Sequence, residues 1–459
     1  MQEIKFGTDG FRGIIADTFT FENVQRISLA LSVYLKKYKQ SSYKKGIALG
    51  YDKRFLSNKF AQATANILSQ NCVPVFITEQ PIPTQAVSLY VRANRLACGI
   101  VLTASHNPYD FNGFKIKDEF GATASKDMTN EIELIIRGGL NVPRLKSDKP
   151  AKIMNVDMLR PYIVFLKNYL DMGIIRKNKF RILVDAMHGA GAGIVETVLK
   201  NSLCQVETIR ANHDVLFGGV NPEPIAENLL ALDKALKLKS YDLAIALDGD
   251  ADRIGAMCPD GQLISSHLAI CLILLHFVEN KKMTGKVVKS ITTTTLVDKI
   301  TAFYNLELEE VAVGFKNIAA KMIKEDVLIG GEESGGIGFK NYMPERDGVL
   351  SGLLLLELMA CRKQGIIEII NDMQKRFGKF FYLRRDLKIK VTKPIARLKN
   401  ILGQDVVEVK TYDGTKFIMR DESWLLIRSS GTEPVARIYA ESKTLKRTKA
   451  LIDFGCALL

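Results

Sequence analysis

The sequence contains no apolar run long enough to cross a lipid bilayer. A transmembrane helix needs about 20 consecutive apolar residues, but the stretches Leu268–Val278 and Val349–Ala360 are shorter, and Glu357 interrupts the second. The segment Met1–Gly13 also lacks the apolar core of a secretory signal peptide. We therefore expect no membrane contact, no export and a cytoplasmic location.

Low-complexity tracts and paired cysteines are absent as well. With 47% apolar residues, 25% charged residues and only 13 prolines, the chain has the composition of a globular protein. The chain of 459 residues is too long for a single domain with one hydrophobic core, because a domain usually holds about 100–200 residues. We therefore expect several domains. An odd number of cysteines without C-x-x-C spacing fits neither a disulfide framework nor a zinc site. We expect reduced thiols at Cys72, Cys98, Cys204, Cys258, Cys271, Cys361 and Cys456.

The net charge of +14 is concentrated near the C-terminus. Between Gln374 and Leu459 there are 19 Lys and Arg against 9 Asp and Glu. A basic surface attracts nucleic acid, but it equally attracts a small anionic substrate, and solvated surface lysines would give the same count. No RRM, KH or zinc-finger signature accompanies the charge. A nucleic-acid-binding protein is therefore the second hypothesis, of a different class.

Four short apolar runs each end abruptly in a polar, glycine-containing loop. Continuous apolar runs of this length are typical of strands that are buried on both faces of a sheet, and ligands bind such sheets beyond the carboxyl ends of the strands. We therefore expect chemistry in the four loops. The runs and loops are Cys98–Leu102 with Thr103–Pro108, Leu243–Leu247 with Asp248–Arg253, Val327–Ile329 with Gly330–Gly336, and Trp424–Ile427 with Arg428–Pro434.

Helical periodicity separates these runs, and the alternation predicts α/β domains. The clearest helical segments are Val24–Tyr38, Lys59–Ser69, Leu229–Leu238 and Val349–Arg362. Breaks near Lys146–Ala151, Pro259–Gly261 and Phe377–Lys379 divide the chain into residues 1–148, 149–258, 259–376 and 377–459. Alternating segments at Leu387–Val391 and Val406–Val409 predict an antiparallel sheet in the last unit, which would make it an α+β domain.

The first loop combines residues suited to group transfer. Ser105 beside His106, with Lys115 ten residues later, offers a nucleophile, a hydrogen-bonding partner and a cation for anionic oxygens. Polar side chains before Pro108 also make ordinary turn hydrogen bonds. The loop on its own therefore leaves both interpretations open.

The second loop places Asp248, Asp250 and Asp252 two residues apart. Three carboxylates crowded after a buried strand repel one another without a cation, and a set of oxygen ligands suits Mg²⁺. A calcium EF-hand does not fit, because its sixth position should be glycine and is Arg253, and its twelfth should be glutamate and is Pro259. The remaining alternative is a cluster that caps a helix N-terminus.

The other loops favour sugar and phosphate ligands. Glu332 and Ser334 offer a carboxylate and a hydroxyl to sugar hydroxyls. The loop that begins at Arg428 combines a guanidinium, hydroxyls and a glycine, as in anion-binding nests, although an ordinary turn would look the same. Arg12 lies among glycines, where a phosphate could approach the backbone. Gly189–Gly193 does not match G-x-G-x-x-G, and close packing of a helix on a strand explains it better.

Together the motifs resemble the α-D-phosphohexomutase family, which contains phosphoglucomutases, phosphomannomutases and phosphoglucosamine mutases. The resemblance covers the whole chain in the family's order. It implies an isomerase with three related α/β domains, mixed sheets and a C-terminal α+β domain around a central active-site cleft. The segments that carry it are Gly7–Gly13, Thr103–Pro108, Asp248–Arg253, Gly331–Gly336 and Arg428–Pro434.

The resemblance also implies a role for each loop. Ser105 would carry the phosphoryl group and would complete a Mg²⁺ site with Asp248, Asp250 and Asp252. Arg12, His106 and Lys115 would join Ser105 in the catalytic set. The substrate-binding set would be Arg253, Glu332, Ser334, Arg428, Ser430, Gly431 and Thr432.

The implied reaction is reversible phosphoryl transfer between O1 and O6 of a hexose phosphate, through phosphoSer105 and a hexose 1,6-bisphosphate. Such a phosphoprotein would serve carbohydrate metabolism. The GEES segment resembles phosphoglucomutases, so glucose phosphate is favoured and mannose phosphate is possible, with a phosphoglucosamine mutase as the alternative. A phosphatase would arise if the phosphoenzyme reacted with water.

One position departs from the resemblance. Some relatives carry His after the glycine of the sugar loop, as in GEMSGH or GEQSGH, whereas this sequence has Gly336. Lys115 is then a hypothesis for acid–base support, which would require a lowered pKa. A purely electrostatic phosphate contact by Lys115 is the alternative. The sequence does not predict an oligomeric state.

Overall fold

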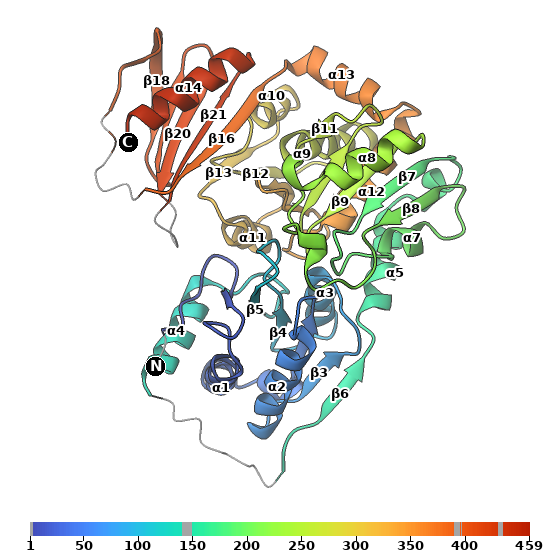
Figure 1. Ribbon diagram of the computed structural model, residues 1–459, viewed down its shortest axis with the longest axis vertical. Helices are drawn as coiled ribbons and strands as arrows, with labels where there is room; N and C mark the ends of the chain where they lie inside the picture. The colour runs from blue at the N-terminus through green and yellow to red at the C-terminus, as the bar shows by residue number, and fades with distance from the viewer. Residues whose placement is uncertain (1–2, 140–148, 390–394, 396, 430–434) are drawn as a thin grey trace.

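The computed structural model describes residues 3–139, 149–389, 395, 397–429 and 435–459. The chain forms four domains, and each is built on its own sheet. Figure 1 shows the first domain (blue) at the bottom, the second and third (green to orange) above it, and the fourth (red) at the upper left. Three mixed α/β domains and a C-terminal α+β domain confirm the predicted fold class.

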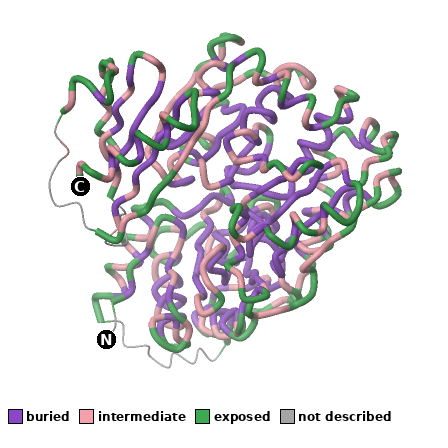
Figure 2. The backbone as a smooth tube through the Cα atoms, turned by 45° about the horizontal axis from the view of Figure 1, so that its top comes forward, coloured by how far each residue is buried: buried purple, intermediate pink, exposed green. Residues whose placement is uncertain are grey.

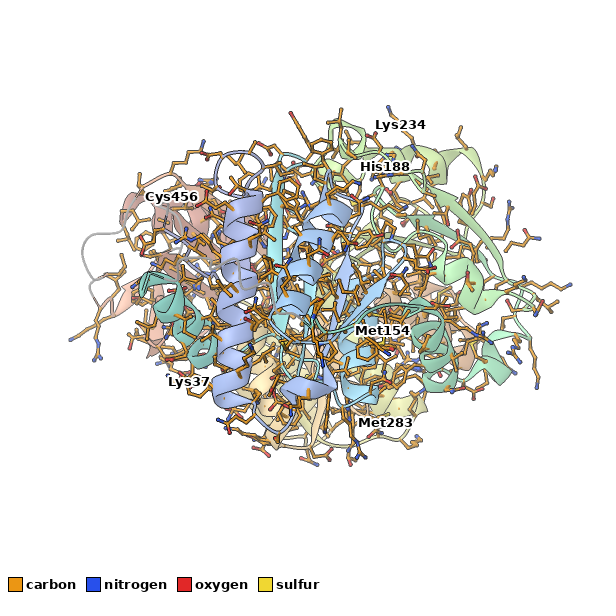
Figure 3. All side chains as sticks on the ribbon, turned by 90° about the horizontal axis from the view of Figure 1, so that it is seen from below. Lys37, Met154, His188, Lys234, Met283 and Cys456 are labelled. Atoms are coloured by element: carbon orange, nitrogen blue, oxygen red, sulfur yellow. The ribbon has the colours of Figure 1, made fainter. Side chains whose placement is uncertain are left out.

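The first domain contains a mixed sheet with helices on both faces. Its elements are β1 (Phe11–Ile14), α1 (Phe21–Tyr38), β2 (Ile47–Tyr51), α2 (Ser57–Gln70), β3 (Val75–Thr78), α3 (Thr84–Ala93), β4 (Cys98–Leu102), β5 (Phe111–Lys117), α4 (Lys126–Arg137) and β6 (Ile153–Val156). The strand order is β1-β5-β4-β2-β3-β6, and β5 alone is antiparallel to both of its neighbours. Because successive side chains of a strand point to opposite faces, Leu49 packs with α1 and α2, whereas Ala48 packs with α3. Figure 3, seen from below, shows α1 and α2 side by side.

The second domain repeats this plan with a shorter sheet. Its elements are α5 (Leu159–Tyr169), α6 (Met172–Ile175), β7 (Arg181–Asp185), α7 (Ile194–Leu199), β8 (Gln205–Ile209), α8 (Leu230–Leu238), β9 (Leu243–Leu247), β10 (Ile254–Met257) and β11 (Leu263–Ile264). The strand order is β11-β10-β9-β7-β8, and β10 is antiparallel to both of its neighbours. All five residues of β9 are buried, as the continuous apolar run predicts.

The third domain holds the two longest apolar stretches of the sequence. Its elements are α9 (Ser266–Leu275), β12 (Lys286–Ser290), α10 (Thr295–Phe303), β13 (Leu308–Val311), α11 (Phe315–Lys324), β14 (Val327–Gly331), β15 (Ile337–Phe339), α12 (Gly348–Arg362) and α13 (Ile366–Phe377). The strand order is β13-β12-β14-β15, with β15 antiparallel. The first stretch begins in α9 and continues three residues beyond it, the second lies in α12, and most of their apolar side chains are buried in the core. No helix in the described ranges is long and apolar enough to cross a membrane.

A continuous core joins the first three domains. It includes apolar side chains of α3 from the first domain, α5 from the second, and α9 and α12 from the third. Figure 2 shows buried backbone running through the centre of the molecule. All seven cysteines have free thiols. The shared core fixes the positions of the three domains relative to one another, and therefore also those of their loops.

The three domains share one hairpin, in which a buried parallel strand is followed by an antiparallel strand. The hairpins are β4–β5, β9–β10 and β14–β15. The loops within them, residues 103–110, 248–253 and 332–336, are three of the four loops that the sequence singles out. Each domain thus offers one loop at the carboxyl end of a central strand.

The fourth domain is an antiparallel sheet covered by one helix. Its elements are β16 (Phe381–Leu387), β17 (Asn400–Ile401), β18 (Gln404–Lys410), β19 (Thr415–Met419), β20 (Trp424–Ser429), β21 (Ala436–Ser442) and α14 (Leu445–Ala457). The strand order is β16-β21-β20-β19-β18-β17. Leu451 and Ile452 of α14 pack on one face of the sheet, and Trp424 and Tyr439 on the other face pack against Ile291 of the third domain.

Glu310 links the third and fourth domains through charge. It follows Glu309 at the end of β13, and its carboxylate lies 3.1 Å from the Lys416 ammonium and 3.0 Å from that of Lys410. Lys289 of the third domain is 3.7 Å away. Burial alone would raise the pKa of Glu310, but Lys416, Lys289 and Lys410 outweigh it and lower the pKa to about 2.

We expect Glu310→Gln to destabilise the protein more at pH 7 than at pH 3.5. Because the folded-state pKa is depressed, the carboxylate stabilises the folded chain above about pH 4.5, and this stabilisation is lost as the pH falls toward 2. The full effect is at most on the order of 3 kcal/mol, since desolvation of Lys416, whose pKa falls to about 8, opposes the pair. Thermal unfolding should show a difference in Tm that narrows on acidification. If the difference in Tm between wild type and Glu310→Gln were the same at pH 7 and pH 3.5, the lowered pKa of Glu310 would be contradicted.

Two strands lie beyond the predicted domain boundaries. β6 pairs with β3 of the first sheet, although the sequence predicts that the first domain ends at residue 148. β11 pairs with β10 of the second sheet, although the sequence predicts that the second domain ends at residue 258. The sheet that a strand joins is decided by its backbone hydrogen bonds, and these cannot be predicted from the local amino-acid composition on which the boundaries depend. The division into residue ranges remains a prediction, and these pairings favour later limits.

Candidate active site

The hairpin loops of the first two domains meet at Ser105. Its hydroxyl donates a hydrogen bond to Asp248 Oδ2 at 2.6 Å, and the side chain is almost fully buried. The Ser105 backbone has a φ of 53°, and its N–H donates to Thr103 Oγ1 at 2.9 Å. The Arg54 guanidinium donates to the Ser105 carbonyl at 2.7 Å. The turn is therefore held from two sides, and it aims the hydroxyl at the aspartate loop.

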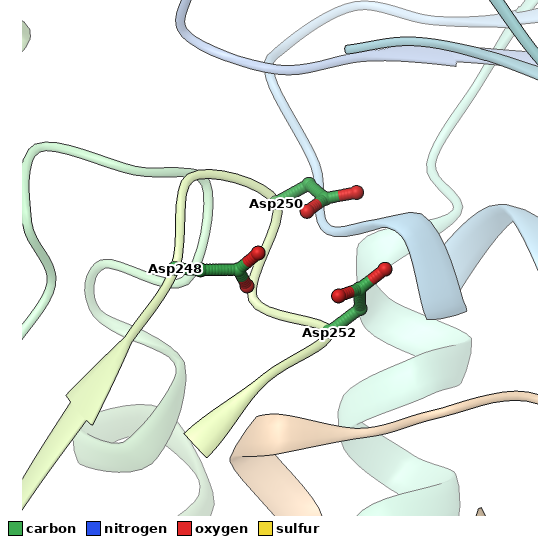
Figure 4. Close-up of side chains that lie close together, drawn as sticks. All are labelled: Asp248, Asp250 and Asp252. Atoms are coloured by element: carbon green, nitrogen blue, oxygen red, sulfur yellow. The ribbon is translucent and has the colours of Figure 1, made fainter. Parts of the chain in front are cut away.

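Asp248, Asp250 and Asp252 converge on one point, as Figure 4 shows. One oxygen of each carboxylate lies within 4.8 Å of the others, and all three residues are buried. Strand β10 follows the loop, so the aspartates do not cap a helix. Burial and the charges of Asp252 and Asp250 raise the pKa of Asp248 well above its ordinary range.

The carboxylates keep free acceptor atoms that suit a cation. Asp250 Oδ1 and Asp252 Oδ1 are buried, and neither has a hydrogen-bond partner among the residues that the structure describes. Buried oxygens without partners are costly unless a ligand satisfies them. An all-oxygen set of this kind fits Mg²⁺, which keeps further positions for water or phosphate oxygens. The residues present therefore fit the predicted metal.

Lys115 lies among three carboxylates rather than in an apolar pocket. Its ammonium is 2.7 Å from Asp250, 2.9 Å from Asp252 and 2.9 Å from Asp9. Burial by itself would lower the pKa of Lys115, but the three carboxylates outweigh it, and the pKa rises. The acid–base hypothesis required a lowered pKa, so this geometry opposes it. An electrostatic role fits the surroundings of Lys115.

Arg346 is a site residue that sequence reasoning missed. Its NH2 group donates to Asp9 Oδ2 at 2.5 Å and to Asp252 Oδ2 at 2.6 Å, so it joins the loops of all three α/β domains. A Cβ on Gly336 would lie 2.2 Å from Arg346 Cδ. Arg346 thus fills the space beside the position where some relatives carry His. The charged triplet at 345–347, just before the apolar helix α12, was the available signal.

We expect Gly336→Ala to destabilise the protein by about 1–3 kcal/mol, the usual cost of overpacking a core. The added methyl group would push Arg346 away from Asp9 and Asp252. Urea unfolding measures the difference. Gly138→Ala is the matched control, because no atom lies closer than 3.5 Å to its added Cβ. Equal stability of the two variants would contradict the close packing at Gly336.

Cationic side chains act on His106, the residue that follows Ser105. Arg12 donates to Asn107 Oδ1 at 2.6 Å, and the Arg253 N–H donates to Asp248 Oδ1 at 3.0 Å. Burial, together with Arg253 and Arg12, lowers the pKa of His106 well below its ordinary range, so the imidazole is neutral at physiological pH. Its Nδ1 lies 3.3 Å from Ser105 Oγ. This field favours a phosphate group on the serine.

The two glutamates of the third loop have different surroundings: Glu332 is fixed within the third domain, and Glu333 faces the fourth domain. Glu332 Oε1 accepts from the Gly314 N–H at 2.8 Å, and burial raises the pKa of Glu332. Ser334 is half-buried in the same loop. Glu333 accepts from Thr292 Oγ1 at 2.9 Å and lies 3.7 Å from Arg384 of the fourth domain. The second glutamate of GEES is therefore engaged at a domain interface.

The fourth loop is described only at its start. Arg428 donates through Nε to Asp413 Oδ1 at 2.6 Å. Ser430, Gly431 and Thr432 lie outside the described residues, and their phosphate-binding role remains a prediction.

The glycine run at 189–193 packs against the metal loop. A Cβ on Gly189 would lie 2.9 Å from the Asp248 carbonyl, and one on Gly191 would lie 2.6 Å from the Leu247 side chain. The glycines at 189–193 allow their backbone to pack directly against the loop that carries the three aspartates. The predicted close packing is present, but the glycines approach the aspartate loop and the end of β9 instead of packing a helix on a strand.

Comparison with known proteins matches each domain of the chain. Models of the phosphoglucomutase/phosphomannomutase family match residues 3–141 (alpha/beta/alpha domain I), 160–261 (domain II), 266–377 (domain III) and 387–454 (C-terminal domain). The phosphoglucomutase/phosphomannomutase of Thermococcus kodakarensis is 29% identical over 99% of this chain and 98% of its own. The phosphoglucosamine/phosphogalactosamine mutase of Sulfurisphaera tokodaii is 30% identical over 95% of each chain.

A solved structure agrees with the sequence relatives. A protein of Thermus thermophilus that is assigned as a phosphomannomutase is 32% identical, covers 100% of this chain and 99% of its own, and superposes with a TM-score of 0.88. The four family matches and these relatives show that the protein is a phosphomutase, an isomerase. The chain belongs to the phosphoglucomutase/phosphomannomutase family, which confirms the family that its motifs resemble.

Proposed function

We propose that the protein interconverts hexose 1-phosphate and hexose 6-phosphate through phosphoSer105 and a hexose 1,6-bisphosphate. Glucose phosphate is the preferred substrate in this proposal, and mannose phosphate is the second. The observation that carries it is the Ser105 hydroxyl, 2.6 Å from Asp248 in a buried set of three aspartates and next to His106, on which several cations act. This placement suits a group that must carry a dianionic phosphate.

In the proposed reaction, a free hydroxyl of the bound sugar phosphate attacks the phosphorus of phosphoSer105. The bond from phosphorus to Ser105 Oγ breaks as the new ester bond forms, and one proton passes overall from the sugar hydroxyl to Ser105 Oγ, which becomes a hydroxyl again. The bisphosphate then reorients, and its other phosphate returns to Ser105 by the reverse steps, so no phosphate is lost. Neutral His106, 3.3 Å from Ser105 Oγ, is placed to hold the proton that this oxygen gains or loses.

The surrounding residues divide the remaining tasks. Asp248, Asp250 and Asp252 would hold Mg²⁺ together with the phosphate of Ser105. When bound, the metal supplies positive charge for the transferred phosphoryl oxygens. Lys115, Arg12 and Arg253 would add to this charge. Glu332 and Ser334 would grip sugar hydroxyls, while Arg428, Ser430, Gly431 and Thr432 would bind the phosphate that does not react. The remaining ligand, a hexose 1,6-bisphosphate, would act as intermediate and activator.

Kinetics with three sugars tests the substrate. We would compare kcat/KM for glucose, mannose and glucosamine 1-phosphates, with Mg²⁺ and a catalytic amount of glucose 1,6-bisphosphate. The highest value is expected for glucose 1-phosphate. A preference for glucosamine 1-phosphate would support the alternative, a phosphoglucosamine mutase, which the Sulfurisphaera tokodaii relative favours by its name.

Product analysis separates the other classes of function. Isomer formation without free phosphate is expected from a mutase, whereas free phosphate as the main product would indicate a phosphatase. Intact-mass measurement should find part of the protein heavier by one phosphoryl group, located at Ser105. Salt-sensitive RNA binding without mutase activity would instead favour the nucleic-acid hypothesis.

A further inference from the structure

Asp413 links the candidate phosphate loop to the third domain. It lies in the turn between β18 and β19, and its two carboxylate oxygens have different partners. Oδ1 accepts from Arg428 Nε at 2.6 Å, and Oδ2 accepts from the Val313 backbone N–H at 2.8 Å. One carboxylate therefore bridges a side chain of the fourth domain and the backbone of the third.

The segment that Asp413 contacts also holds the sugar loop. Gly314 follows Val313, and its N–H donates to Glu332 Oε1 at 2.8 Å. Its φ of 117° lies in the region that favours glycine. Val313 packs against Trp424 and other apolar side chains of the fourth domain. Three hydrogen bonds thus connect the Arg428 guanidinium to the Glu332 carboxylate through one fixed piece of backbone.

Asp413 also sets the orientation of the guanidinium. It engages Nε, and in the described part of the chain the two terminal nitrogens of Arg428 have no hydrogen-bond partner. A guanidinium that is held at Nε presents its terminal nitrogens as a fork, the geometry that recognises a phosphate. Only small fractions of the Arg428 and Asp413 side chains, 13% and 15%, are exposed. The ion pair of Arg428 and Asp413 is therefore largely buried at the interface between the third and fourth domains.

We infer that Asp413 is a positioning residue, which holds Arg428 at a fixed distance and orientation from Glu332. It would couple recognition of the phosphate end of the substrate to recognition of the sugar ring. This inference deepens the proposed function and rests on it. Asp413 would act through Arg428, so its removal should weaken substrate binding more than it slows the chemical step.

Asp413→Asn tests the inference, with Glu422→Gln as the matched control. An amide accepts one hydrogen bond but faces the second donor with its own N–H groups, so one of the two contacts must break. Glu422 also bridges the two domains, between Lys299 at 2.7 Å and Lys443 at 2.6 Å, but it does not touch Arg428. For glucose 1-phosphate we expect the KM of Asp413→Asn to rise at least about 10-fold and kcat to change less than about 3-fold. The KM of Glu422→Gln should stay within about 2-fold of wild type.

A double-mutant cycle shows whether Asp413 acts through Arg428. In an Arg428→Ala background, Asp413→Asn should raise KM by less than about 2-fold, because the group that it positions is gone. An unchanged KM in the single variant, or full additivity in the double variant, would overturn the inference. If Asp413→Asn does not fold, Asp413→Glu is the second test, since the longer side chain moves the guanidinium and should give the same rise.

Binding of inorganic phosphate separates this inference from the proposed function. If the wild-type protein interconverts no hexose phosphate, the proposed reaction fails, but calorimetry with inorganic phosphate still tests Asp413. Weaker phosphate binding by both Asp413→Asn and Arg428→Ala would support the positioning role. Unchanged binding by Asp413→Asn, together with loss in Arg428→Ala, would overturn it.

Discussion

Ser105→Ala is expected to lower kcat/KM at least about 10⁴-fold, the scale of losing a covalent nucleophile. The substitution removes one hydroxyl and its hydrogen bond to Asp248. That bond contributes about 1 kcal/mol to stability, so the variant should remain folded. Turnover with glucose 1-phosphate measures the loss, and intact mass should show that the phosphorylated fraction has disappeared.

Ser57→Ala provides the matched control for Ser105→Ala. Ser57 is a buried serine of the same domain, and its hydroxyl donates to Asp52 Oδ1 at 2.8 Å. Its replacement should reduce stability by a similar amount but reduce turnover less than about 10-fold. Normal turnover in Ser105→Ala would exclude the phosphoenzyme mechanism, whatever the control shows.

Asp248→Asn should abolish most of the activity without destabilising the metal-free protein. The substitution removes one negative charge from three crowded, buried carboxylates, so repulsion falls. Turnover should drop by about 10³-fold, as for the loss of a strong electrostatic contact in the transition state. Thermal unfolding with EDTA and with Mg²⁺ gives a second readout. The Mg²⁺-dependent rise in Tm of the wild type should be lost in the variant.

Asp185→Asn distinguishes a metal ligand from an ordinary buried aspartate. Asp185 ends β7 of the same domain, and its carboxylate accepts from Arg210 Nε at 2.8 Å. Breaking this pair should destabilise the protein, while the response of Tm to Mg²⁺ should persist. An Asp248→Asn variant with the same Mg²⁺ response as wild type would show that Asp248 is not a ligand.

Local patterns predicted the central strands and the helices well. The limits of β4 and β9 match the predicted runs, because a continuous apolar segment ends there in a polar loop. The helix predicted at 24–38 begins three residues earlier, at Phe21, where Thr20 caps it through the Asn23 N–H. The strand predicted at 327–329 continues to Gly331, since glycines carry no apolar signal. Local sequence thus predicts elements better than it predicts their ends.

The residues of the candidate site could be predicted from the sequence where they are close to one another along the chain. The three aspartates form one segment, and their spacing alone pointed to a cation. Asp413 and Arg346 gave no comparable signal, because their partners are distant, 100 residues away for Val313 and 337 for Asp9. The choice between the two roles of Lys115, acid–base support and an electrostatic contact, could not be made from the sequence for a similar reason. A sequence does not show that carboxylates from two domains surround one ammonium group.

The contact between Arg346 and Asp9 can form only late in synthesis, because the two residues are 337 positions apart in the chain. A ribosome adds about 5–20 residues per second, so about 20–70 seconds pass between the synthesis of Asp9 and that of Arg346. During this interval the first two domains can fold, but Asp9 and Asp252 lack the guanidinium that joins them. In a nascent chain that ends before residue 346, Lys115 can reach these carboxylates but the Arg346 guanidinium cannot, so the acidic centre is neutralised only in part. Completion of the charge network is a late event in biosynthesis, set by the third domain.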